Sequence, residues 1–309
     1  MEFLNFLAGL RNPVCDALFS VITMLGEETV FILIGLLFFW CINKKEGYYL
    51  LTVGLFGTVL NQFLKLLFRV PRPWVRQPGF LPVEEAVGEA TGYSFPSGHT
   101  QSAVGIFGGI ARWNKGWLLR TLCIAVCVLV GFSRMYLGVH TPADVLVSAL
   151  LAVILIFALY PLMAKCTESP KTMRILMGCM LVATVGFLAF ALTRPRTGLD
   201  EAALSNLLHG IENGYKMLGC LAALWLAYEV DYNWSHFETK AVWWAQVLKL
   251  VIGLLPILAI KSGLKQPLYA LIPNEGLADF VRYFLLTAFA GCVWPLTFRW
   301  WGTFGKAGK

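Results

Sequence analysis

Residues 133–144 have the sequence SRMYLGVHTPAD and lie between two apolar runs, the first of which is 118–132. The stretch contains Arg134, His140 and Asp144, so a cation, an imidazole and a carboxylate interrupt an otherwise apolar chain. A polar break between two long apolar runs indicates two helices joined by a short turn. The polar residues of that turn are the first candidates for chemistry.

Thr141 and Pro142 are typical of the N-cap and the first position of a helix, where the missing N–H of proline has no consequence. This predicts that Asp144 lies in the first helical turn, with His140 just before it. A carboxylate there can hold one imidazole nitrogen and leave the other free to attack an electrophile, while Arg134 supplies charge for an anion. The alternative is an ordinary polar corner where the chain leaves a membrane.

Composition indicates the class of protein. The chain has 309 residues, of which 58% are hydrophobic and 14% are charged, whereas a water-soluble domain has about 25% charged residues. Apolar runs that approach the roughly 20 residues of a membrane span recur along it. We therefore predict an all-α, polytopic helical membrane protein with about nine transmembrane helices. The expected spans are 24–42, 48–68, 97–112, 117–132, 144–163, 173–192, 202–228, 241–261 and 277–300.

The chain is predicted to form one membrane domain over 1–309, in which residues 1–28 form an interfacial segment and 172–300 hold the C-terminal spans. Lys and Arg counts predict the orientation. Twelve lie on the face that holds the C-terminus and nine on the face that holds the long polar loop 69–95. The face with twelve is expected to be cytoplasmic, so that the chemistry faces outward from the cell's inner (plasma) membrane.

Two further stretches lie on the same predicted face. The first places Lys65 one turn inside the end of a span and Arg72 just beyond it, between two prolines that stiffen the chain. The second, at 94–100, has the sequence SFPSGHT and starts the next helix. Backbone N–H groups at a helix N-terminus, together with Ser97, can bind an anion beside His99. Each stretch alone would also suit an ordinary membrane interface.

Several functions are excluded or disfavoured. The eight cysteines fall mostly in apolar runs without a paired spacing, which indicates core residues and neither disulfides nor metal ligands. No basic run with interleaved aromatic residues indicates nucleic-acid binding. No carboxylate cluster indicates Mg²⁺ or Zn²⁺, so neither a metal nor another cofactor is expected. No pattern indicates an oligomeric state.

In chain order the three stretches have the patterns Lys-x6-Arg-Pro, Pro-Ser-Gly-His and Ser-Arg-x5-His-x3-Asp. The chain thereby resembles the type 2 phosphatidic acid phosphatase superfamily, or lipid phosphate phosphatases, whose distant soluble relatives include bacterial acid phosphatases and vanadium haloperoxidases. The resemblance covers a phosphatase core over 45–163, and the last four spans lie outside its motifs. The matching residues are Lys65, Arg72, Pro73, Pro96, Ser97, Gly98, His99, Ser133, Arg134, His140 and Asp144.

The resemblance implies a role for each position. His140 would attack phosphorus and form a phosphohistidine, Asp144 would orient it, and His99 would protonate the leaving alkoxide and then activate water. The residues that would bind the phosphoryl oxygens are Lys65, Arg72, Ser97, Gly98 and Arg134. The chemistry agrees, because phosphoryl transfer requires a nucleophile, an acid and concentrated positive charge.

The expected function is metal-independent hydrolysis of a membrane lipid phosphomonoester or a polyprenyl diphosphate, although a soluble phosphate ester is not excluded by the motifs. Two alternatives stay open: a phosphotransferase that passes phosphate to a lipid or sugar, and a non-enzymatic lipid binder or transporter. Other polar residues inside the predicted spans suit either ion pairs that fix packing, which we favour, or a substrate entrance. They are His209, Glu212, Lys216, Lys249, Asp279 and Arg282.

Overall fold

The computed structural model describes residues 1–166 and 169–304, and these residues form helices and connecting segments without a strand. The chain forms two compact units. Unit 1 comprises Met1–Leu33, Thr52–Pro161 and Thr193–Gly210, and unit 2 comprises Ile34–Leu51, Leu162–Leu192 and Ile211–Lys309. The two units are described separately, because every residue predicted for the site belongs to unit 1.

Unit 1 contains the helices up to α9, apart from η1, and the start of α11. Helices α3, α4, α9 and α11 also contribute residues to unit 2. The elements are α1 (Glu2–Ala8), α2 (Pro13–Met24), α3 (Glu28–Leu37), α4 (Lys44–Phe68), α5 (Pro73–Arg76), η2 (Glu84–Ala86), α6 (Gly98–Ala103), η3 (Val104–Gly108), α7 (Gly109–Trp113), α8 (Trp117–Tyr136), α9 (Pro142–Cys166) and α11 (Glu201–Val230).

Unit 2 contains the remaining elements. These are η1 (Phe38–Ile42), α10 (Pro170–Leu192), η4 (Asp231–Ser235), α12 (Trp243–Gly263), α13 (Lys265–Leu271), α14 (Glu275–Ala288), η5 (Phe289–Val293), η6 (Trp294–Thr297) and α15 (Phe298–Trp301). Lys44 is paired with Asp231 at 2.8 Å and donates to the Phe237 carbonyl at 3.0 Å, which fixes the segment after η4.

The membrane character of the chain follows from its helices. Within the described ranges, six helices are long and apolar enough to cross a membrane, and α2 with α3 makes a seventh if this pair, bent by 47°, counts as one span. The polytopic all-helical fold is therefore confirmed, but the count of nine is not. The segment α6 to α7 is short, and α11 carries charged residues along its length, so neither meets the criterion for a span.

The turn between α8 and α9 forms as its sequence predicts. Pro142 is the first residue of α9, and the Asp144 N–H donates to Thr141 Oγ1 at 3.4 Å. Gly138 has a φ of +78°, which a residue with a side chain adopts only with strain. The Arg134 carbonyl accepts hydrogen bonds from the N–H groups of Val139 and His140, both at 3.2 Å. This folds the turn back against the end of α8.

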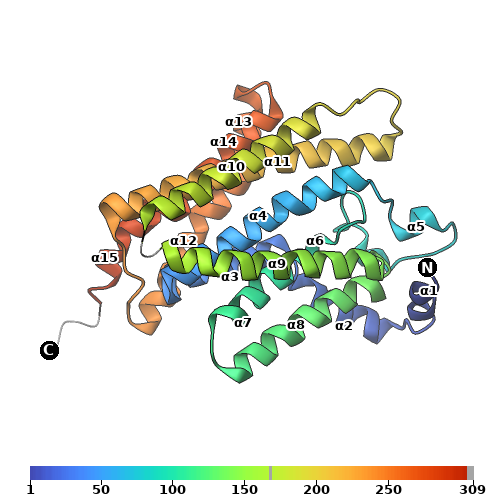
Figure 1. The fold of residues 1–309 in the computed structure, drawn as a ribbon, viewed down its shortest axis with the longest axis horizontal. Coiled ribbons are helices and arrows are strands. Elements are labelled where there is room, and N and C mark those ends of the chain that lie inside the picture. The colour runs from blue at the N-terminus through green and yellow to red at the C-terminus, as the bar shows by residue number, and fades with distance from the viewer. Residues whose placement is uncertain (167–168, 305–309) are drawn as a thin grey trace. The chain divides into compact units, whose positions relative to one another are not determined.

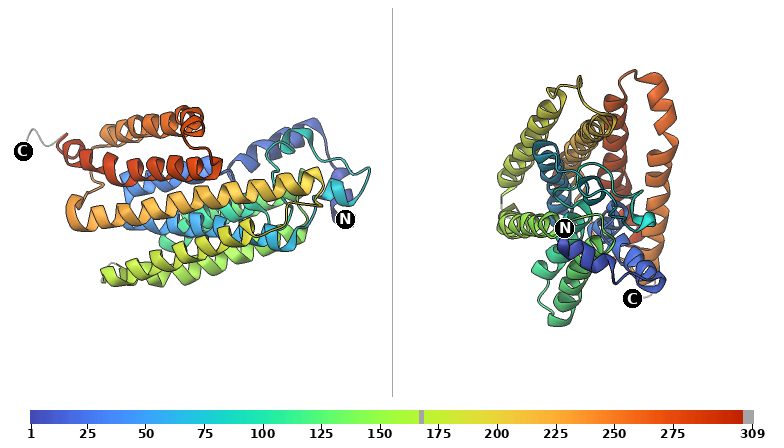
Figure 2. Two further views of the ribbon diagram at one scale, coloured as in Figure 1. Left: turned by 90° about the horizontal axis from the view of Figure 1, so that it is seen from above. Right: turned by 90° about the vertical axis from the view of Figure 1, so that its right-hand side faces the viewer.

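The N-terminal helices pack beside this turn. Phe19 of α2 contacts the ring of Tyr136 at a centroid distance of 4.4 Å, and the Tyr136 hydroxyl donates to Asp16 at 2.8 Å. Figures 1 and 2 show α1, α5 and the α8–α9 turn at the same end of unit 1. In α1, Leu4 and Leu7 are buried while neighbouring apolar residues are exposed, a pattern that an interfacial helix has.

Candidate active site

Asp144 is held by donors from two segments. Its Oδ2 accepts a hydrogen bond from Ser94 Oγ at 2.6 Å and another from the Thr141 N–H at 2.7 Å. The same oxygen lies 3.5 Å from His140 Nδ1, and both side chains are buried. A carboxylate that is fixed in this way can orient an imidazole and favour a proton on the facing nitrogen.

The other ring nitrogen of His140 faces Arg72. Arg72 Nη1 lies 2.9 Å from His140 Nε2. A guanidinium group has only donors, so Nε2 must be the acceptor in this contact. The proton of the neutral ring is therefore on Nδ1, beside Asp144. Nε2 carries the lone pair, which is the arrangement that a histidine nucleophile requires.

Arg72 is tied to the backbone around the site. Its Nε donates to the Gly92 carbonyl at 3.1 Å, its Nη1 to the Val139 carbonyl at 3.1 Å and its Nη2 to the Thr91 carbonyl at 2.6 Å. These carbonyls belong to the long polar loop and to the α8–α9 turn. Arg72 thus joins both segments that frame His140.

Lys65 lies in the last turn of α4, where it is buried and donates to the Tyr93 carbonyl. The loop carbonyls at 91–93 therefore accept hydrogen bonds from both Lys65 and Arg72. A lysine ammonium has three donors and a guanidinium has five. Each of these cations therefore keeps at least one N–H group for a phosphoryl oxygen while it holds the loop.

Arg134 has open donors. Its side chain is fully buried, and Nη1 donates to Thr23 Oγ1 of α2 at 2.8 Å. Among the described residues, Nε and Nη2 have no hydrogen-bond partner. A buried donor without a partner costs about 1–3 kcal/mol, and more on a charged group. These two N–H groups therefore favour the binding of an anion.

Ser97 is the N-cap of α6 and lies where the sequence predicted that the next helix starts. Its Oγ accepts from the Thr100 N–H at 3.4 Å and from Thr100 Oγ1 at 3.0 Å, and its own N–H donates to the Asp144 carbonyl at 3.1 Å. A β-carbon placed on Gly98 would meet no atom within 4 Å, so the start of the helix faces open space. His99 follows, and its buried Nε2 has no hydrogen-bond partner within the described part of the chain.

The charges of these segments act on His140, which lies outside the membrane-spanning helices. Burial is the main cause that lowers the pKa of His140 well below its usual value of 6.5, and the positive charges of Arg72, Arg134 and Lys65 lower it further. His99 adds a smaller contribution in the same direction. Residues from α4, from the segment between α4 and α5, from α6 and from α8 thus lie within electrostatic reach of one imidazole.

Sequence reasoning missed several residues of this site. Ser94 begins the stretch 94–100 but had no predicted role, and Thr23 lies in a segment for which we expected only interfacial contacts. The three carbonyls at 91–93 also had no role, because a loop sequence does not show which backbone atoms face a cation. Of these missed groups, only Ser94 could have been suspected from the sequence, because it lies three residues before Ser97 in the same stretch.

Other polar residues in the helices form local contacts. Lys216 pairs with Glu212 at 2.6 Å within α11, and Arg282 pairs with Asp279 within α14. The Arg282 side chain also donates to the Lys261 carbonyl at 3.1 Å. Among the described residues, no group of three or more His, Cys, Asp or Glu side chains is placed to hold a metal ion.

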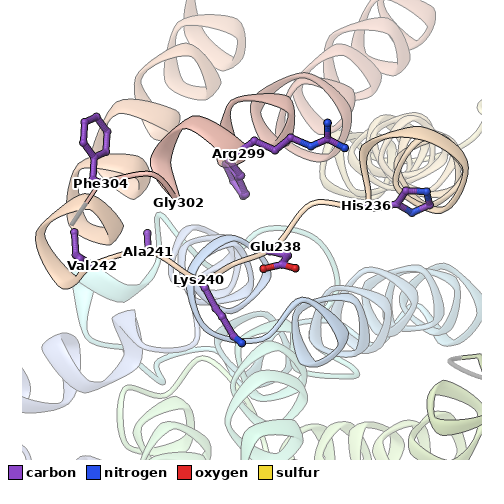
Figure 3. Close-up of a pocket in the computed structure, with 9 residues that line it drawn as sticks. His236, Glu238, Lys240, Ala241, Val242, Arg299, Gly302 and Phe304 are labelled. Carbon is purple, nitrogen blue, oxygen red and sulfur yellow. The ribbon is translucent and has the colours of Figure 1, made fainter. Parts of the chain in front are cut away.

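A separate pocket of about 610 Å³ lies within unit 2. Its lining includes His236, Glu238, Lys240 and Arg299, and none of the predicted site residues. Figure 3 shows the side chains of Lys240 and Arg299 pointing away from one another. Cations that diverge do not concentrate charge on one ligand atom, so we place the candidate active site in unit 1.

The matched families agree with this geometry. Residues 46–168, which include Lys65 and Asp144, match the PAP2 superfamily, and residues 215–307 match the PAP2 superfamily phosphatase transmembrane extension. Phosphatidylglycerophosphatase B of Bacillus subtilis is 31% identical over 163 residues, which are 48% of this chain and 75% of that protein. The chain belongs to the PAP2 superfamily. The family predicted from the three motifs is thereby confirmed.

Other curated PAP2 relatives are lipid phosphatases by name. Undecaprenyl-diphosphatase BcrC of Bacillus subtilis is 33% identical over 120 residues, which are 38% of this chain and 58% of that protein. Sphingosine-1-phosphate phosphatase 1 of Rattus norvegicus is 26% identical over 278 residues, which are 84% of this chain and 62% of that protein. The chain thus spans less than two thirds of either relative's length.

One solved structure is similar to this PAP2 chain. The crystal structure of Aquifex aeolicus LpxE matches with a TM-score of 0.43 and 28% sequence identity, and the match covers 51% of this chain and 92% of that one.

Proposed function

We propose that this chain is a membrane phosphatase that hydrolyses a lipid phosphomonoester or a polyprenyl diphosphate through a phosphohistidine on His140. The observation that carries the proposal is the contact between Arg72 Nη1 and His140 Nε2 at 2.9 Å, with Asp144 on the other side of the ring. This arrangement leaves Nε2 as the only ring nitrogen with a lone pair. Names of the PAP2 relatives support a lipid phosphate as the substrate.

In the first step Arg72 Nη1 donates to a phosphoryl oxygen in place of His140 Nε2. The freed lone pair of Nε2 attacks phosphorus, and the bond from phosphorus to the leaving oxygen breaks. His99 donates a proton to that oxygen, so the lipid leaves as a neutral alcohol when the substrate is a monoester. Asp144 stabilises the positive charge that develops on the His140 ring. The negative charge of the transition state spreads over the equatorial oxygens, which Lys65, Arg72 and Arg134 bind.

In the second step water replaces His140 on phosphorus. His99 now accepts a proton from that water, and the bond between Nε2 and phosphorus breaks. The open space beside Gly98 at the start of α6 gives the phosphoryl group and this water room to approach the helix N-terminus. Three fixed cations provide the electrostatic stabilisation that a divalent metal supplies in other phosphatases, so no metal is required.

We place the site at the outward face of the cell's inner membrane, because the opposite face carries more Lys and Arg residues. The exposed apolar residues of α1, including Phe3 and Phe6, would then rest in the membrane interface beside the site. A lipid whose head group lies at this depth can reach His140 without leaving the bilayer.

The test is a phosphate-release screen over a panel of lipid phosphates, with EDTA present. The unmodified protein is expected to release phosphate, and His140→Ala is expected to release none above background. Vanadate should inhibit, because it forms a five-coordinate mimic of phosphorus. Transfer of labelled phosphate to an added lipid or sugar, with little free phosphate, would replace the hydrolase by a phosphotransferase. Binding of lipid phosphate without any turnover would contradict both.

A further inference from the structure

A third histidine lies beside the candidate active site, outside both matched family segments. His209 belongs to the first third of α11 and to unit 1. A β-carbon on Gly92 would lie 3.7 Å from His209 Cδ2 and 3.9 Å from Lys65 Cδ. His209 and Lys65 therefore both lie next to Gly92. The Gly92 carbonyl accepts the hydrogen bond from Arg72 Nε at 3.1 Å.

The position of His209 is fixed by close packing. A β-carbon on the next residue, Gly210, would lie 2.7 Å from a Leu66 methyl group, so α11 and α4 approach as closely as a glycine allows here. Leu66 follows Lys65 directly. The backbone of α11 at His209 therefore cannot shift along α4 without breaking this contact, which keeps His209 beside Lys65.

Tyr93 and Asp200 are further polar residues on the Lys65 side of the candidate active site. Burial raises the pKa of Tyr93, whose carbonyl accepts from Lys65, while the charge of Arg69 lowers that pKa and the charge of Asp200 raises it. Asp200 accepts from the Ala203 N–H at 2.7 Å and so caps α11. Asp200, at the start of α11, is thus within electrostatic reach of Tyr93, the residue whose carbonyl accepts the hydrogen bond from Lys65.

The net charge of the buried site residues determines how much negative charge on a substrate they can balance. Lys65, Arg72 and Arg134 are three buried cations and Asp144 is one buried carboxylate. Their net charge of +2 balances that of a phosphomonoester, which carries about −1.5 to −2 at neutral pH. A lipid diphosphate brings at least one further negative charge, for which these four residues hold no counterpart.

We propose that His209 binds the lipid-linked phosphate of a diphosphate substrate and so determines a preference for diphosphates over monophosphates. This rests on the proposed function. His140 Nε2 would attack the terminal phosphorus, the bond from that phosphorus to the bridging oxygen would break, and the lipid monophosphate would leave with that oxygen. His209 donates a hydrogen bond to the departing phosphate and so stabilises it as the bond breaks.

The test compares farnesyl diphosphate and farnesyl monophosphate, which share the same lipid tail, as substrates of the full-length protein. His209→Leu, which has a side chain of similar size without a donor, is expected to lower kcat/KM for the diphosphate about tenfold, the effect of losing a hydrogen bond to a charged group. For the monophosphate, kcat/KM should stay within about twofold. His209→Lys supplies another hydrogen-bond donor and should keep the preference for the diphosphate.

His236→Leu in unit 2 is the matched control and should change neither value. An equal loss for both lipids, or no loss for either, would overturn the role of His209 while the proposed function stands. Release from other lipids of the panel but from neither farnesyl lipid would overturn the role of His209 and leave the proposed function standing, whereas release from no lipid of the panel would overturn both. Protection against thermal unfolding by a methylene bisphosphonate lipid, present in the unmodified protein and lost in His209→Leu, gives a readout without turnover.

Discussion

Ser94 Oγ donates a hydrogen bond to Asp144 Oδ2 over 2.6 Å. The two residues are 50 positions apart, and both side chains are buried. The contact links the long polar loop to the first turn of α9. It makes the loop part of the apparatus that orients His140, because the same carboxylate oxygen lies 3.5 Å from His140 Nδ1.

Ser94→Ala tests this link. Loss of the donor frees Asp144 to rotate, so we expect kcat to fall about 10- to 100-fold, as is usual when a group that orients a catalytic ligand is removed. The thermal unfolding temperature should change little, and Ser94→Thr should recover part of the rate. Ser235→Ala, a buried serine of unit 2, serves as the control. Full activity in Ser94→Ala would show that Asp144 is held without the loop.

Thr23→Val tests the contribution of α2. Thr23 Oγ1 is the acceptor for Arg134 Nη1 at 2.8 Å, and valine has the same shape without the oxygen. We expect KM for a lipid phosphate to rise about three- to tenfold, because Arg134 loses the contact that fixes its guanidinium plane. Thr23→Ser should behave like the unmodified protein. If Thr23→Val and Thr23→Ser have the same KM, α2 does not contribute to substrate binding through Arg134.

Gly138→Ala tests the shape of the turn. Gly138 has a φ of +78°, and a β-carbon there would lie 2.5 Å from Arg11 Nη2 and 3.0 Å from the Phe80 ring. The left-handed backbone alone costs roughly 1–2 kcal/mol for a residue with a side chain. We expect a lower unfolding temperature and lower activity. Gly88→Ala is the matched control, since a β-carbon there meets nothing within 4 Å. Equal unfolding temperatures for both variants would contradict the left-handed conformation of this turn.

The lowered pKa of His140 predicts how stability depends on pH. Burial and the neighbouring cations disfavour the protonated ring in the folded protein, so the unfolded chain binds more protons below its own pKa of about 6.5. Stability therefore falls as the pH drops through about 6.5 toward the folded pKa. The unmodified protein should lose about 2–4 °C more than His140→Asn between about pH 7.5 and 5.5. An equal loss in both would show that His140 is not held neutral.

The sequence predicted those parts of the molecule that depend on local patterns. Thr141 and Pro142 marked the start of α9, and Ser97 marked the start of α6, because capping chemistry is read from a few adjacent residues. The motifs identified the PAP2 superfamily before any geometry was known. The roles of the individual site residues stay predictions, although the structure brings Arg72, His140 and Asp144 into contact.

What the sequence did not show depends on contacts between distant segments. The hydrogen bond from Arg134 to Thr23 joins residues 111 positions apart, and no pattern in either segment signals it. The position of His209 beside Gly92 likewise depends on how α11 packs against α4. The number of spans was also not confirmed, since a helix such as α11 combines the necessary length with charged residues whose pairing only a structure shows.

The most direct measurement of the central claim is to trap the covalent intermediate. His99→Ala should still be phosphorylated by p-nitrophenyl phosphate, whose leaving group needs no proton, but it should fail to activate water. Mass spectrometry of the rapidly quenched protein is then predicted to find an acid-labile phosphate on His140, and none in the double variant His99→Ala, His140→Ala. Phosphate on another residue, or hydrolysis that continues without His140, would contradict the account.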